Sequence, residues 1–72
     1  MIDLSRFKVI YGEKVLNAIA LLHHEVADGV DLVKDKIIKL EFLTLMVVGT
    51  DGNIEVISDE AWMFQFIPIV TK

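Results

Sequence analysis

A regular alternation of side chains between Lys36 and Ile57 constrains the fold of this chain more than any other feature. Six residues at alternate positions would share one face of an extended strand: Ile38, Leu40, Phe42, Thr44, Met46 and Val48. Alternation with a period of two, rich in β-branched and aromatic residues, is typical of a strand. The pair Asp51-Gly52 then supplies the positive φ angles of a tight turn, and Ile54–Val56 alternates again. This stretch therefore predicts a β-hairpin.

Two further strands are predicted near the ends of the chain. Residues 6–11 alternate, and the Gly12-Glu13 pair that follows suits a type II′ hairpin turn. Residues 62–67 also alternate, with three aromatic residues on one side. Pro68 cannot donate a hydrogen bond to a neighbouring strand, so it places this last strand at a sheet edge or ends its pairing.

The segment Lys14–Val26 fits two kinds of structure. As a helix, it would place Val15, Ile19, Leu22 and Val26 on one stripe. As a strand, it would pair with residues 6–11 through the Gly12-Glu13 turn and be buried on both faces. No Ser, Thr, Asp or Asn precedes the segment as a helix cap, so we favour the strand.

The predicted fold is therefore all-β, a small antiparallel barrel or bent sheet of four to five strands in hairpin order. The alternative is an α+β domain with a helix over residues 14–26. Between the strands, Ala27-Asp28-Gly29 predicts a turn and residues 30–35 a loop or short edge strand. Residues 58–61 predict a brief break, one helical turn capped by Ser58 or Asp59.

The size and hydrophobicity of the chain favour self-association. Its 72 residues make a single domain, and a domain of this size buries only about 60% of the surface that its unfolded chain exposes. Yet 54% of the residues are hydrophobic, mean hydropathy is +0.56, and no disulfide is possible without cysteine. Large apolar side chains should stay exposed on one copy, so we expect a homo-oligomer, with a dimer favoured.

Charge and composition argue against several classes of partner. The net charge of −4 disfavours a surface for nucleic-acid phosphates, which is normally basic. The N-terminus lacks the pattern of a signal peptide. The longest uncharged run, residues 61–71, is shorter than the roughly 18 residues that a membrane helix needs. These features predict a cytoplasmic protein without membrane contact.

The sequence offers no convincing catalytic or metal site. His23-His24-Glu25 is the one cluster of metal-ligating residue types, but adjacent side chains diverge on a strand or a helix. Asp28, Asp31 and Asp35 lack the spacing of a calcium loop. Cysteine nucleophiles and glycine-rich phosphate loops are absent from the sequence. We therefore expect no metal, no cofactor and no enzymatic activity.

An aromatic row, Trp62, Phe64 and Phe66, is the candidate binding feature. On one strand face these rings could anchor a partner, and with Phe42 we predict that they form a partner or oligomer interface. The same row could stack unpaired bases of single-stranded nucleic acid, aided by Arg6, Lys8 and Lys14. The acidic net charge favours the first reading, a non-enzymatic protein that self-associates through apolar strand surface and binds another protein.

Two parts of the chain resemble small uncharacterised proteins of Gram-positive bacteria and their prophages. They are residues 6–22 and the stretch that runs from Asp51-Gly-Asn-Ile-Glu-Val-Ile to Phe64-Gln-Phe-Ile-Pro-Ile69. The resemblance covers about half of the chain and implies no activity, cofactor or site. It adds weight to the all-β prediction.

Overall fold

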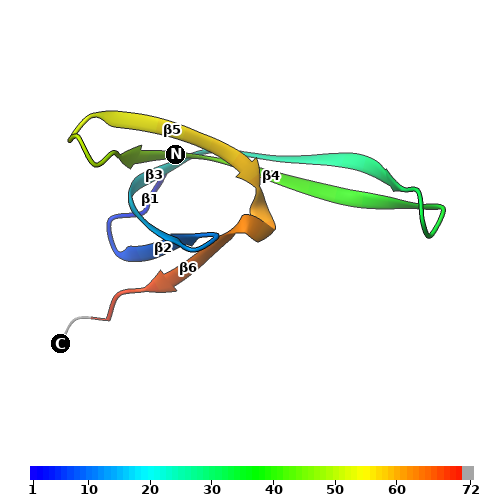
Figure 1. The fold of residues 1–72 in the computed structure, drawn as a ribbon, viewed down its shortest axis with the longest axis horizontal. Coiled ribbons are helices and arrows are strands. Elements are labelled where there is room, and N and C mark those ends of the chain that lie inside the picture. The colour runs from blue at the N-terminus through cyan, green and yellow to red at the C-terminus, as the bar shows by residue number, and fades with distance from the viewer. Residues whose placement is uncertain (71–72) are drawn as a thin grey trace.

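Two long strands, β3 (Lys14–Asp31) and β4 (Lys36–Val48), form a hairpin that runs the length of the molecule (Figure 1). The computed structural model describes residues 1–70, and its principal extents are 46 × 29 × 24 Å. The two strands pair antiparallel from Asp31 opposite Lys36 to Asn17 opposite Val48. The strand predicted over residues 14–26 is confirmed, and the helical alternative is wrong. The predicted burial on both faces is also wrong, since Val15 and Val26 are exposed.

Four shorter strands complete one antiparallel sheet. These are β1 (Ile2–Asp3), β2 (Phe7–Tyr11), β5 (Ile54–Glu60) and β6 (Phe64–Pro68). The strand order is β5-β4-β3-β2-β6, and β1 pairs separately with β3. The prediction of a bent all-β sheet is confirmed, although the sheet has six strands and is not closed into a barrel. Hairpin order fails at β6, which follows β5 in sequence but pairs with β2 at the opposite edge.

The sheet bends where β3 changes its pairing. The register with β4 shifts between Ala18 and Ala20, and again between Leu21 and His23. Such β-bulges insert an extra residue, bend the strand and increase its twist. The bend carries β2 and β6 across the sheet to lie opposite β4 and β5 (Figure 1). One strand can therefore pair with β2 at its start and with β1 and β4 further along.

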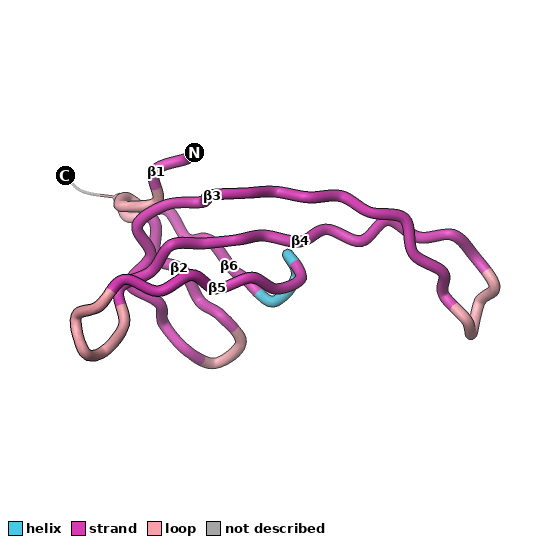
Figure 2. The backbone as a smooth tube through the Cα atoms, turned by 90° about the horizontal axis from the view of Figure 1, so that it is seen from above, coloured by secondary structure: helices cyan, strands magenta, loops and turns pink. Residues whose placement is uncertain are grey.

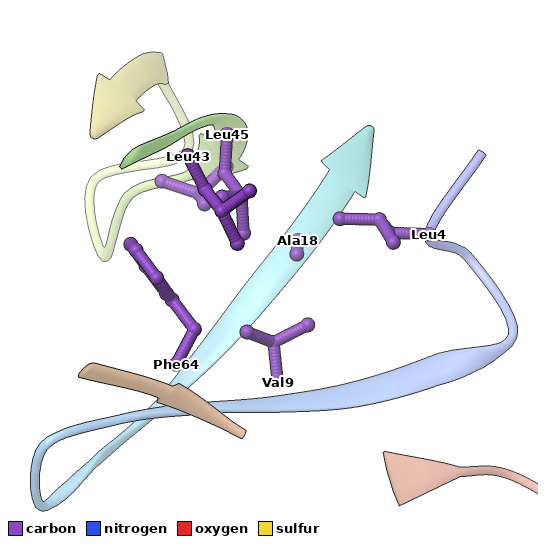
Figure 3. Packing of buried hydrophobic residues seen from close by; sticks show 7 residues of the cluster. Leu4, Val9, Ala18, Leu43, Leu45 and Phe64 are labelled. Carbon is purple, nitrogen blue, oxygen red and sulfur yellow. The ribbon is translucent and has the colours of Figure 1, made fainter. Parts of the chain in front are cut away.

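The core fills the inside of this bend. Its members come from β2, β3, β4, β6 and the segment after β1: Leu4, Val9, Ala18, Leu43, Leu45, Val47 and Phe64. Figure 3 shows Val9 and Phe64 facing Leu43 and Leu45 across the core. The inner face of β4 is thus its odd-numbered face, so Phe42 lies on the opposite, half-buried face.

The turns follow glycine where the sequence predicts it. Gly12 has φ of 60°, while Asp35 is the single non-glycine residue with positive φ in residues 1–70, so Glu13 has the negative φ of a type II′ turn. Gly52 has φ of 84°, and its N–H donates to the carbonyl of Gly49 over 3.0 Å. The predicted Gly12-Glu13 turn is confirmed. In the second hairpin Gly52 has the predicted positive φ but Asp51 does not, because Val48 pairs with Ile54 and residues 49–53 form a longer loop in place of a tight turn.

Two local predictions are wrong. Residues 27–29 continue β3, because the chain reverses only at residues 32–35, where the carboxylate of Asp31 accepts hydrogen bonds from the N–H groups of Val33 and Lys34 over 3.0 and 3.2 Å. The helical turn expected near residue 58 is the 3₁₀ helix η1 (Ala61–Met63), and Glu60 at its N-cap makes no capping hydrogen bond through its side chain. The strand predicted over residues 62–67 consequently begins at Phe64. Pro68 ends β6 at the sheet edge, as predicted.

Candidate interaction surface on the projecting arm

Beyond the body, β3 and β4 continue as a two-stranded arm. The pairing of β1 reaches β3 only as far as Leu21, and the pairing of β5 reaches β4 only back to Phe42. Residues 24–41, which we call the arm, extend past the other strands in both views (Figures 1 and 2). A two-stranded hairpin is at best marginally stable alone in water, so few contacts within one copy stabilise the arm.

The far end of the arm is apolar and exposed. Four residues form what we call the tip patch, with exposed fractions of 61%, 89%, 95% and 78%: Val30, Leu32, Val33 and Ile37. Val30 and Ile37 are opposite each other in the ladder, so they share one face, and Leu32 and Val33 lie in the turn. Gly, Pro, Asn, Asp and Ser dominate ordinary turns. An apolar pair at a turn tip is therefore unusual, and it leaves apolar side chains in contact with water.

Polar pairs cross the arm on the same face as Val30 and Ile37. The Nζ atom of Lys39 lies 2.5 Å from an oxygen of Asp28, and the Nε2 atom of His24 lies 3.5 Å from an oxygen of Glu41. All four side chains are exposed, and such pairs are worth about 0–1 kcal/mol each. They help to hold the strand register and leave the tip patch uncovered.

On the opposite face of the arm, side chains pack against the neighbouring strand. A Cβ atom built on Gly29 would lie 2.6 Å from Cδ1 of Leu40, so the Leu40 side chain occupies the space beside that glycine. Ala27 and Phe42 lie on the same face and are half-buried. This face is therefore better covered than the tip patch within a single copy.

The body carries an open groove beside the start of β3. Its volume is about 600 Å³, and its lining includes Phe7, Lys8, Val15, Leu16, Ile19 and Ile69. Val15 and Ile69 are more than half exposed at its rim. We call this cavity the body groove. Apolar cavities of this size are typical of binding sites.

The predicted interface residues do not share one face. Trp62 lies in η1 with 76% of its surface exposed, and its indole N–H donates to the Glu60 carboxylate. Phe64 is buried in the core, its ring centroid 4.9 Å from that of Tyr11. Phe66 and Phe42 are half-buried on β6 and β4. The prediction of a continuous aromatic row is wrong, because η1 breaks the alternation before the strand begins.

The tip patch is the candidate surface that the sequence interpretation missed. The signal was present, since Leu32 and Val33 are two consecutive apolar residues inside a segment predicted as a loop or short edge strand. Alternation could not reveal it, because the exposure of these residues depends on where the hairpin reverses. The turn predicted at residues 27–29 lies too early in the chain, since the hairpin reverses at residues 32–35.

A hydrogen bond between two titratable side chains links strands on opposite sides of the bend. The Tyr11 hydroxyl donates to the Asp59 carboxylate and so connects β2 with β5 across the bend. This bond, followed by the backbone N–H of Glu60, lowers the pKa of Asp59, and it raises the pKa of Tyr11. Within residues 1–70, His, Cys, Asp and Glu form no group of three or more that could hold a metal ion, and His23 is exposed.

No protein-family model, curated protein or solved structure matches the chain. The resemblance to small bacterial and prophage proteins therefore stays a prediction. In the described part of the chain, no helix has the length and apolar character to cross a membrane.

Proposed function

We propose that this protein is a small non-enzymatic interaction protein that self-associates through the apolar surface of its arm and binds another protein. The tip patch is the observation that carries the proposal. Leu32 and Val33 lie at the end of a projecting hairpin, almost completely exposed, where a single copy gains nothing from their being apolar.

The total surface supports cover by a second molecule. The accessible surface is 5716 Å², whereas a compact monomer of 8.1 kDa would expose roughly 4,500 Å². The radius of gyration is 14.4 Å, against about 11 Å expected for a compact domain of this length. The excess of roughly 1,200 Å² exceeds the ~800 Å² that each partner contributes to a stable interface.

Light scattering after size exclusion, from low micromolar to near-millimolar concentration, tests the proposal. We expect the mass to rise above the 8.1 kDa of one chain. The variant Leu32→Ser with Val33→Ser should show a lower mass than the parent, because it lacks the apolar side chains of the contact. It should still fold, because these side chains contribute little to the fold of one copy. Val56→Ser, at an exposed apolar position of β5, is the matched control and should behave like the parent. A constant mass of 8.1 kDa across the range would contradict self-association.

Binding of single-stranded nucleic acid is the second function that the sequence suggests, and the two can be separated by fluorescence. Trp62 donates to the Glu60 carboxylate, and Lys39, which lines a pocket with it, is paired with Asp28. Phe64 is buried, so the aromatic residues do not form a base-stacking platform beside free cations. Titration with an oligonucleotide at low salt should leave the Trp62 emission unchanged. Quenching that weakens with added salt would favour the nucleic-acid function instead.

A further inference from the structure

We infer that the tip patch of each copy binds in the body groove of a second copy, so that two chains exchange arms in a two-fold dimer. The inference rests on the proposed self-association and specifies its contact. The two surfaces occur in one chain, both are apolar, and a single copy cannot bring them together.

The positions of the two surfaces along β3 make the contact self-complementary. Val15, Leu16 and Ile19 of the groove belong to the beginning of this strand, and the tip turn follows its last residue, Asp31. The arm points away from the body (Figure 1), so the tip does not fold back onto its own groove. A two-fold axis near the middle of β3 would bring each tip to the partner's groove. Closed two-fold pairs of this kind are the commonest homo-oligomers.

The shapes and polarity of the surfaces match. The groove has about 600 Å³ of open volume, which accommodates two aliphatic side chains. Its walls are largely apolar, and Val15 and Ile69 at the rim are exposed in a single copy. Insertion of Leu32 and Val33 would remove apolar surface from water on both partners at once, which is the main driving force of association.

Charged groups at the two surfaces allow ion pairs between exchanged arms. Lys8 lines the groove, and within the described part of the chain it forms no ion pair. At the tip, Asp31 and Asp35 lie beside Leu32 and Val33, together with Lys34 and Lys36. An exchanged arm would bring Asp31 or Asp35 toward Lys8 of the other copy, and opposite charges on facing surfaces favour the correct docking orientation.

A tip-to-tip dimer satisfies these observations less well. It would leave the body groove and its exposed rim open to water.

Cysteine cross-linking tests the contact directly, because the chain contains no cysteine. The variants Val33→Cys at the tip and Val15→Cys at the groove rim are mixed and oxidised at a concentration where light scattering shows dimers. We expect a disulfide-linked pair in the mixture and little in either variant alone. Val56→Cys replaces Val15→Cys in the matched control, since it is similarly exposed on β5, and it should not cross-link to Val33→Cys.

The other outcomes separate the contact from the function. Dimers that cross-link through Val33→Cys alone, or equally well to Val56→Cys, would overturn arm exchange and leave self-association intact. A monomer at every concentration would overturn both. A bimane label on Val33→Cys that responds to phosphatidylcholine vesicles and not to protein concentration would assign the tip to a lipid surface instead. For Leu32→Ser with Val33→Ser, we expect the dimer Kd to rise at least about tenfold.

Discussion

Removal of the outer part of the arm should leave the body folded. This experiment tests whether the body folds independently of the arm. In the variant that we suggest, Asn-Gly replaces residues 28–39, so that the paired residues Ala27 and Leu40 flank a two-residue hairpin turn. Leu40 keeps its place near Trp62, with which it lines a small surface pocket.

The expected change in unfolding free energy is small and favourable. No member of the core cluster lies in residues 28–39, so no buried side chain is lost. The connection shortens from twelve residues to two. Since each halving of a flexible loop is worth about 0.6 kcal/mol, the shortening contributes at most ~1.5 kcal/mol. The paired strands of the arm already offset part of this loop-closure cost in the parent. We therefore expect the unfolding free energy to rise by about 0–1.5 kcal/mol.

Urea unfolding followed by circular dichroism measures this change. Both proteins must be compared at a concentration where the parent is monomeric, because self-association would add to its apparent stability. The urea dependence of the free energy should fall only slightly, since the arm buries little surface. A loss of more than about 2 kcal/mol, or an unfolded variant, would refute the division, because only core disruption explains so large a loss.

Two further predictions concern the body. Leu45→Ala should lower the unfolding free energy by about 2–5 kcal/mol, because Leu45 is fully buried, whereas Ile37→Ala on the arm should change it by less than about 0.5 kcal/mol. Tyr11→Phe should raise the pKa of Asp59 toward its ordinary value, as followed by NMR titration of the carboxyl. Since the pKa of Asp59 is lower in the folded chain, the bond stabilises the fold above the ordinary carboxyl pKa and is lost as pH falls through the folded-state value, so this variant should lose stability less steeply in acid.

Each of these has a clear contrary result. Equal losses for Leu45→Ala and Ile37→Ala in urea unfolding would mean that the arm contributes to the core. In a chain whose total stability is about 4–11 kcal/mol, the expected difference is readily measured. An unchanged Asp59 titration in Tyr11→Phe would show that the carboxylate does not depend on the hydroxyl, since the phenylalanine ring keeps the stacking on Phe64.

The strands that alternate without interruption were predictable from sequence, and β3 shows why others were not. In β4 each residue after Lys36 keeps its phase, so the period of two is visible. In β3 the two register shifts near Ile19 and Leu22 each move the apolar residues to the other face. The resulting spacing of Val15, Ile19, Leu22 and Val26 resembles a helical stripe, although the chain is extended throughout.

The remaining differences arise from contacts between distant parts of the chain. Nothing local in Phe64–Pro68 shows that it pairs with β2 and not with β5, its neighbour in sequence. Trp62, Phe64 and Phe66 alternate in sequence as a strand would, yet η1 rotates Trp62 out of that pattern. The tip patch, the candidate site, depends on the exact position of the chain reversal, which composition alone does not determine.

The pairing of β6 with β2 has a consequence for synthesis. On the ribosome, β2 emerges early, but its second neighbour does not exist until residues 64–68 leave the exit tunnel. Phe64, which completes the core beside Val9, arrives with them. Fragments that stop before Phe64 would expose Val9 and an unpaired β2 edge, so we expect proteases to degrade them faster than chains that include residues 64–68.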